Sequence, residues 1–320
     1  MKLLFCGLGQ IAKRHITIIQ RHFPHYEIFA LRLQNKTSGS IAGVKELYNW
    51  AEVNSHAFAA AFITSPTYLH IPQALECACR GIPIFIEKPL GNSLEKLDDL
   101  LVEIRIRRIS SYVAYNFRFH PLVLKLKEKL AGKKILHARI VFGGYMPNWR
   151  TKKDYRQSAT VFRTQGGGVI LDCSHEIDMA AFLFGSLRRI DGRAGRVSGL
   201  TEDAEDFADI LLTHERTPAT LHLNFFSRVT ERTLTVETEE NTYHLDLKQG
   251  VLRTGNDGAL EDEEFTGDRD VMYAAQLKYF FENIGNPRMM NDLFEAAPLF
   301  EKMLAFRNAA WQPKRSLDKK

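Results

Sequence analysis

Apolar positions follow two different patterns along the chain. Up to residue 115, short apolar runs of strand length alternate with stretches in which apolar residues recur every three or four positions. The strand candidates are residues 2–6, 28–31, 57–63, 82–86 and 112–115. The helix candidates are residues 11–21, 68–80 and 93–108, the last with Asn92 or Ser93 as its N-cap. This alternation predicts an α/β domain with a doubly wound parallel sheet.

The pattern changes after residue 120. A helix candidate at 121–130 and a strand at 135–142 precede a polar loop at 143–165 and a helix at 169–184. Strand-like alternating segments follow at 206–212, 219–226, 234–237 and 243–247, and the last helix candidates are 271–283 and 292–311. We therefore predict a doubly wound α/β domain at residues 1–118 and an α+β domain with a mostly antiparallel sheet at 119–320. The C-terminal helices are candidates to pack back on the first domain.

Composition narrows the range of functions. With 45% hydrophobic and 25% charged residues, the chain can bury two cores. The net charge of +5 comes from 43 basic residues interspersed with 38 acidic ones, so we expect anionic small molecules and no nucleic acid as partners. No apolar stretch approaches the roughly 20 residues of a membrane helix. The four cysteines lack paired spacings, which favours a reducing, cytoplasmic location without structural zinc.

A glycine turn follows the first strand candidate. Gly7 and Gly9 stand before Gln10 and Ile11, and Ala12 takes the third small position of a Gly-x-Gly-x-x-Ala fingerprint. Small residues there let a pyrophosphate approach the N-terminus of the next helix, whose free amides favour anions. We expect this turn to bind a dinucleotide.

The end of the second strand candidate indicates which dinucleotide binds. A carboxylate that grips a ribose 2′-hydroxyl is expected at its end, yet Arg32 stands there, with Lys36 nearby. An arginine suits a 2′-phosphate, so NADP is the first choice and NAD the second. The alternative is that Arg32 stacks on the adenine, which is compatible with NAD.

Two further loops follow strand candidates and are expected to contact the cofactor. Ser65, Pro66 and Thr67 follow the third strand and lead to His70, although Thr67 is equally suited to cap a helix. Glu87 and Lys88 follow the fourth strand. A lysine at the end of a buried strand either reaches solvent or has a chemical task.

A triple-glycine segment, 166–168, precedes the second group of candidates, and its glycines are expected to allow backbone close to a ligand. Asp172 and His175 follow three residues apart, which on one helix places both on the same face. Histidine transfers protons near neutral pH, and a carboxylate can orient it. Metal binding and simple packing of His175 are the alternatives, and we expect no metal because no further ligand cluster completes a site.

The polar loop mixes aromatic and arginine side chains. Aromatic faces pack on sugar rings, and arginines bind carboxylates or phosphates. An exposed connector is the alternative reading. The substrate candidates in this loop are Trp149, Arg150, Tyr155, Arg156 and Arg163.

Together these motifs resemble the Gfo/Idh/MocA oxidoreductase family. The matching segments are residues 7–12, 87–91, 116–121 and 166–178, in family order. The resemblance implies a Rossmann domain, a C-terminal domain with an open, mostly antiparallel sheet, and homodimers or homotetramers. One departure is that the family histidine usually lies four residues after the aspartate, where this chain has Glu176.

The resemblance also implies hydride exchange between NAD or NADP and a secondary alcohol or ketone of a sugar, sugar acid, cyclitol or nucleotide sugar. It implies Lys88, Asp172 and His175 as catalytic residues that also bind substrate. Asn116 is implied at the nicotinamide and Arg118 at the substrate. Cleavage of glycosides with bound NAD and a non-catalytic dinucleotide sensor are the alternative functions.

Overall fold

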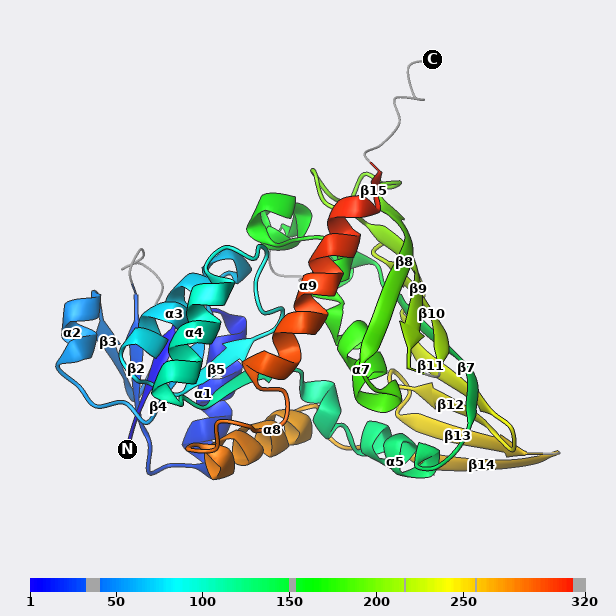
Figure 1. Cartoon of the computed structure of the whole chain (residues 1–320), viewed down its shortest axis with the longest axis horizontal. Coiled ribbons are helices and arrows are strands. Elements are labelled where there is room, and N and C mark those ends of the chain that lie inside the picture. Colours follow the sequence, from blue (N-terminus) through cyan, green and yellow to red (C-terminus); the bar gives the residue numbers. More distant parts are fainter. Residues whose placement is uncertain (33–40, 150–153, 216, 257, 313–320) are drawn as a thin grey trace, which may run out of the picture. The chain divides into compact units, whose positions relative to one another are not determined.

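The computed structural model describes residues 1–32, 41–149, 154–215, 217–256 and 258–312. The chain divides by its internal contacts into two compact units (Figure 1). The first comprises residues 1–116 and 269–298, and the second comprises residues 117–268 and 299–320. Residues 269–298, which include one of the C-terminal helices, thus belong to the first unit.

The first unit contains a six-stranded parallel sheet. Its strand order is β3-β2-β1-β4-β5-β6, so the chain runs outward from β1 to one edge and then outward from β4 to the other. This is the doubly wound arrangement of Rossmann folds, and it confirms the predicted fold class of this part. The strands are β1 (Lys2–Cys6), β2 (Glu27–Leu31), β3 (Val44–Leu47), β4 (Ala60–Ile63), β5 (Ile84–Glu87) and β6 (Ser111–Ala114).

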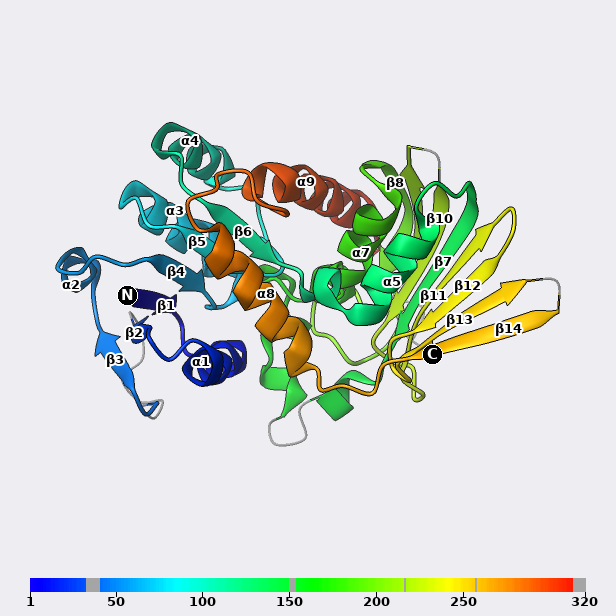
Figure 2. The same cartoon turned by 90° about the horizontal axis from the view of Figure 1, so that it is seen from below.

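Helices cover both faces of this sheet. Figure 2 shows α1 (Gln10–His22) and α8 (Asp270–Asn283) on one face, and α3 (His70–Cys79) and α4 (Leu97–Arg107) on the other. The short elements α2 (Trp50–Asn54) and η1 (Thr67–Leu69) complete the unit. Strands β1, β4 and β5 are buried on both faces, which explains their continuous apolar runs.

Aromatic rings fill the layer beneath α1 and α8. Phe5 and Phe62 stack with centroids 4.7 Å apart, and Phe85 lies 4.8 Å from Phe62. Phe280 of α8 packs edge-on against Phe62 and Phe85 at 5.7 and 5.2 Å. These contacts attach α8 to the sheet although about 185 residues separate it from β5 in the sequence.

The second unit contains a nine-stranded, mostly antiparallel sheet of order β14-β13-β12-β11-β7-β10-β9-β8-β15. The pairs β7–β10 and β8–β15 are parallel. This agrees with the predicted α+β class. The strands are β7 (Ile135–Gly143), β8 (Leu187–Gly195), β9 (Phe207–His214), β10 (Pro218–Asn224), β11 (Glu231–Thr238), β12 (Thr242–Asp246), β13 (Val251–Asn256), β14 (Ala259–Glu264) and β15 (Trp311–Gln312).

Helices α5 (Pro121–Leu130) and α7 (Ser174–Phe184) lie on one face of this sheet (Figures 1 and 2). The short α6 (Val169–Asp172) precedes α7, and α9 (Leu293–Ala309) is the last helix among the described residues. The loop predicted at 143–165 contains four 3₁₀ turns: η3 (Met146–Trp149), η4 (Tyr155–Gln157), η5 (Ala159–Val161) and η6 (Arg163–Gln165). A further 3₁₀ turn, η2 (Asn116–Phe119), precedes α5.

Several predicted boundaries differ from the structure. Helix α4 begins at Leu97, after Lys96 with a left-handed φ of 62°, so neither Asn92 nor Ser93 is its N-cap. The strand predicted at 57–63 begins only at Ala60. The pattern also did not predict β3, β8, β13 or β14. Within the described residues, no helix is both long and apolar enough to cross a membrane.

Candidate functional site

Three loops meet at the carboxyl edge of the parallel sheet. Gly7 follows β1, Ser65 lies just after β4, and Lys88 follows β5. These strands are consecutive neighbours, and the chain reverses direction across the sheet between β1 and β4. Ligands of open α/β sheets bind in the crevice at this position.

Gly7 forms a close approach between two of these loops. Its φ is +100°, and a Cβ there would lie 2.8 Å from the Ser65 Cα. The Thr64 hydroxyl donates to the Gly7 carbonyl at 2.9 Å, which holds the turn against the end of β4. Gly9 is the N-cap of α1 and makes no side-chain cap hydrogen bond, and the first turn of α1 carries no acidic residue. The turn therefore has a shape and charge that suit an anionic pyrophosphate.

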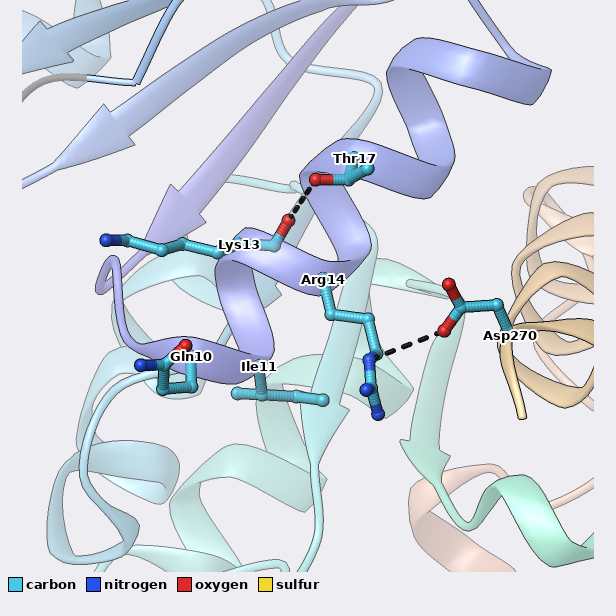
Figure 3. A pocket seen from close by; sticks show the side chains of 6 residues that line it. All are labelled: Gln10, Ile11, Lys13, Arg14, Thr17 and Asp270. Carbon is cyan, nitrogen blue, oxygen red and sulfur yellow. Dashed lines mark hydrogen bonds and ion pairs between the residues drawn. The ribbon is translucent and has the colours of Figure 1, made fainter. Parts of the chain in front are cut away.

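A surface pocket lies along the beginning of α1. Gln10 and Ile11 line it together with Lys13, Arg14 and Thr17 of the same helix and Asp270 at the start of α8 (Figure 3). Arg14 pairs with Asp270 at 3.4 Å. The two cofactor candidates of α1 thus lie beside open, mainly basic surface.

Two buried oxygens of the first unit are available to a ligand. Among the described residues, neither Ser65 Oγ nor Asn116 Oδ1 has a hydrogen-bond partner. Asn116 is 3% exposed, and an unsatisfied buried polar atom is costly. Pro66 is the N-cap of η1 and Thr67 is its first residue, so Thr67 does not cap a helix. Together with the cradle at Gly7, these oxygens fit a bound dinucleotide.

His70 joins the cofactor loop to the lysine loop. Its Nδ1 lies 2.8 Å from the Pro89 carbonyl oxygen and its Nε2 lies 2.9 Å from the Ser65 carbonyl oxygen. The ring is buried, and this burial lowers the pKa of His70 below its ordinary value. A neutral imidazole has only one N–H, so it donates to one carbonyl at a time. The predicted cofactor role of His70 thus becomes an indirect one, through the two loops.

Glu87, the residue before Lys88, pairs with a buried histidine of α1. His15 Nε2 of α1 lies 2.6 Å from Glu87 Oε1, and the two side chains are 0% and 10% exposed. The His15 ring also packs edge-on against Phe85 at 5.2 Å. This pair fixes the end of β5, so the half-buried Lys88 leaves the strand from a fixed position.

Arg32 is also paired. Its Nη1 lies 2.7 Å from Glu46 Oε1 of β3, and its side chain is 5% exposed. A carboxylate from the neighbouring strand thus lies beside Arg32 at the end of β2. Lys36 lies outside the described residues.

In the second unit, the triple-glycine segment packs against protein. A Cβ at Gly167 would lie 2.2 Å from the Ala159 carbonyl oxygen, and one at Gly168 would lie 2.4 Å from Glu205 Oε1. Arg307 donates to the Gly167 carbonyl. The interpretation that these glycines admit a ligand is therefore corrected: they admit the chain's own backbone and a buried carboxylate.

Asp172 and His175 lie on two helices rather than one. Asp172 ends α6, Cys173 leaves the helical conformation at φ −101° and ψ 27°, and α7 begins at Ser174. The prediction of a single helix at 169–184 was wrong, because the apolar pattern continues through the break. Both side chains are half-buried. The His175 ring packs against Phe117 with centroids 4.6 Å apart.

Glu176 has a structural partner from the sheet. Arg232 Nε of β11 lies 2.8 Å from Glu176 Oε1, and the Glu176 side chain is 0% exposed. The Arg232 guanidinium lies over the rings of Phe117 and Phe142, at 5.0 and 4.4 Å from their centroids. Arg232 therefore supports both the residue after His175 and the ring that packs on His175.

Arg118 forms a buried bidentate pair with Asp178. Its Nε and Nη2 donate to the carboxylate oxygens at 3.0 and 2.7 Å. The two side chains are 4% and 0% exposed, so the guanidinium joins η2 to α7. We predicted that Arg118 contacts the substrate directly, and its pairing with Asp178 does not favour such a contact.

The remaining substrate candidates have different environments. Trp149 is 40% exposed and packs edge-to-face on Phe225 at 5.1 Å. Arg156 is exposed and lies over the Tyr155 ring at 5.5 Å. Arg163 instead pairs with buried Glu205 at 3.0 Å, and burial lowers its pKa. Arg150 lies outside the described residues.

The described residues contain no group of three or more His, Cys, Asp or Glu side chains arranged to hold a metal ion. They do contain three partners that sequence reasoning missed, namely His15, Glu46 and Arg232. Of these, His15 gave a signal, because it lies on the apolar face of α1 between Ala12 and Ile16.

Two family models match the chain. The oxidoreductase family model with an NAD-binding Rossmann fold matches residues 1–110, and the GFO/IDH/MocA C-terminal domain model matches residues 124–244. Over 187 residues the chain is 28% identical to scyllo-inositol 2-dehydrogenase (NAD(+)) from Bacillus subtilis (strain 168), covering 56% of this chain and 53% of that one. It is 27% identical over 195 residues to the uncharacterized oxidoreductase YrbE of the same organism, covering 56% and 52%.

The chain thus matches about half the length of these curated relatives. A solved structure of levoglucosan dehydrogenase in complex with NADH has the same fold, with a TM-score of 0.83 at 15% identity, covering 97% of this chain and 98% of that one. Fold, motifs and both domain models agree, and the chain belongs to the Gfo/Idh/MocA oxidoreductase family.

Proposed function

We propose that this protein is a dehydrogenase or reductase that exchanges a hydride between a nicotinamide dinucleotide and a secondary alcohol or ketone of a sugar, sugar acid, cyclitol or nucleotide sugar. The observation that carries the proposal is the carboxyl edge of the parallel sheet, where Gly7, Ser65 and Lys88 follow three neighbouring strands at the switch point. Relatives named for a cyclitol and an anhydrosugar support the substrate class.

Gly7, Gly9, Gln10 and Ile11 would hold the pyrophosphate, and Ser65 and Asn116 offer their unsatisfied oxygens to the cofactor. When bound, the nicotinamide supplies the hydride acceptor or donor. His70 keeps the Ser65 loop and the Lys88 loop at a fixed separation. Pro66 and Thr67 begin η1 beside Ser65 and remain proposed contacts of the cofactor.

We assign the proton transfer to Lys88, Asp172 and His175. Oxidation of a carbinol requires that the hydroxyl proton leaves, so a base must be within hydrogen-bond reach of it. His175 is the proposed base, and packing against Phe117 fixes its ring. Lys88 stabilises the developing negative charge on the substrate oxygen, and Asp172 orients His175 or binds a neighbouring hydroxyl.

Trp149, Tyr155 and Arg156 are proposed substrate contacts, because all three are on the partly exposed 3₁₀ turns between β7 and α6. Arg118 is proposed to act through Asp178 by fixing the start of α7. Four free cysteines agree with a cytoplasmic location.

We also propose a homodimer or homotetramer that associates through the sheet face away from α5 and α7. Leu211 of β9 is 56% exposed, and Thr220 of β10 and Val141 of β7 contribute to a depression beside it. Leu211→Asp should shift the molar mass measured by light scattering to that of a monomer, and an unchanged oligomer would contradict this interface.

The function is tested with a panel of inositols, hexoses, sugar acids and nucleotide sugars. Each is incubated with NAD or NADP, and the absorbance of the reduced nicotinamide is followed. Net cofactor reduction by one class supports the proposal. Cleavage of aryl glycosides without net cofactor change would indicate the glycosidase chemistry instead, and tight cofactor binding without any turnover would indicate a sensor.

A further inference from the structure

Arg32 is held against the neighbouring strand by its backbone and its side chain. Its N–H donates to the Leu47 carbonyl at 2.9 Å, which extends the ladder between β2 and β3. The guanidinium donates from Nη1 to Glu46 Oε1 at 2.7 Å. Only 5% of the Arg32 side chain is exposed.

Glu46 is held from both sides. Its second oxygen accepts a hydrogen bond from the Tyr48 hydroxyl at 2.9 Å. The hydrogen bond from Arg32 is the largest cause that lowers the pKa of Glu46 below its ordinary value, so the carboxylate is ionised at neutral pH. Arg32 and Glu46 therefore form a charge-neutral pair beside the end of β2.

We propose that Glu46 is a specificity-determining residue that makes the chain select NAD over NADP. The inference rests on the proposed dinucleotide function. A 2′-phosphate carries up to about two negative charges, and Arg32 can attract it only while Glu46 repels it. A ribose 2′-hydroxyl carries no charge, and a nearby carboxylate is a suitable acceptor for it.

This inference reverses the preference that Arg32 alone suggested. An arginine at the end of the second strand favours a phosphate when its charge is available. Here the acceptor for Arg32 comes from β3, a strand whose four residues include a single buried one. The selectivity therefore depends on a contact between positions 14 residues apart in the sequence.

The experiment measures the dissociation constants of NAD and NADP by calorimetry for the wild type and for Glu46→Gln. Glutamine retains the shape but removes the negative charge. We expect the wild type to bind NAD more tightly, and Glu46→Gln to shift the affinity ratio toward NADP by about tenfold or more, because a like-charge contact is worth at least one such factor.

Glu27→Gln is the matched control. Glu27 begins β2 and pairs with Lys45 of β3 at 2.9 Å, so the variant makes the same charge change between the same two strands. We expect the affinity ratio of this variant to equal that of the wild type. If Glu46→Gln does not fold, Glu46→Ser also removes the negative charge and should shift the ratio in the same direction.

The possible results separate the two hypotheses. Tighter binding of NADP than of NAD by the wild type, or equal shifts in Glu46→Gln and Glu27→Gln, would overturn the role of Glu46 and leave the dinucleotide function intact. Failure of the folded wild type to bind either nucleotide would overturn the proposed function, and this inference with it.

Discussion

Replacing Gly168 by alanine tests whether the triple-glycine segment serves internal packing. The backbone of Gly168 has φ +105° and ψ 153°, a region that is nearly exclusive to glycine. A Cβ there would also lie 2.4 Å from Glu205 Oε1. That carboxylate cannot easily move, because it is fully buried and accepts hydrogen bonds from Arg307 at 2.7 Å and from Arg163 at 3.0 Å.

Two costs add in Gly168→Ala. The backbone conformation costs about 1–3 kcal/mol for a residue with a side chain. Displacing the packed carboxylate adds about 1–3 kcal/mol of overpacking. We therefore expect the free energy of unfolding to fall by about 2–6 kcal/mol. Urea unfolding followed by far-UV circular dichroism measures it.

Gly185 provides the control for the backbone term. It ends α7 with φ +85° and ψ −172°, in the same glycine region, and a Cβ there would meet no atom within 4 Å. Gly185→Ala should therefore lose only the backbone term, about 1–3 kcal/mol. Equal losses in the two variants would refute the argument that Glu205 crowds Gly168.

Two further predictions concern buried groups of the second unit. Burial lowers the pKa of His120 from 6.5 to about 4. Between pH 6.5 and pH 4 the unfolded chain therefore binds more protons than the folded one. The free energy of unfolding should fall by about 2–3 kcal/mol as the pH decreases through this range. His120→Asn keeps an acceptor for the Leu122 N–H at the N-cap of α5. The variant should show a smaller loss of unfolding free energy between pH 7 and pH 4, measured by urea titration. An unchanged pH dependence would contradict this prediction. Arg232→Gln removes the ion pair between Arg232 and buried Glu176 and should lower turnover at least tenfold at unchanged cofactor affinity, whereas Arg232→Lys should recover part of the activity. Wild-type turnover in Arg232→Gln would contradict the support proposed for His175.

The parallel sheet could be predicted because its central strands are buried on both faces. The runs at β1 and β5 contain four consecutive buried residues each, so the sequence pattern is unambiguous. Strand β3 has one buried residue, and β14 has none, with Leu260 72% exposed. Such strands form because an adjacent strand offers backbone hydrogen bonds, and the sequence of the strand itself does not show which strand will lie beside it.

Some candidate site residues could be predicted from local sequence, and others could not. The cradle at Gly7 follows from local backbone requirements, so its motif is readable in the sequence. The glycines at 167 and 168 were recognised but for a different reason, because Glu205 and residues 159–160 approach them only in the folded chain. His15, Glu46 and Arg232 act on partners 72, 14 and 56 residues away, respectively, and no spacing rule identifies such pairs.

The central claim is that His175 takes the hydroxyl proton and Lys88 stabilises the developing charge on the substrate oxygen during hydride exchange at a bound nicotinamide. The most direct test is to measure, with the best substrate of the panel, the single-turnover rate of nicotinamide reduction and the dissociation constant of NAD for the wild type, Lys88→Ala and His175→Ala. The account predicts rates reduced by about 10²–10⁴-fold in both variants with cofactor affinity retained. Wild-type rates in both variants would contradict it.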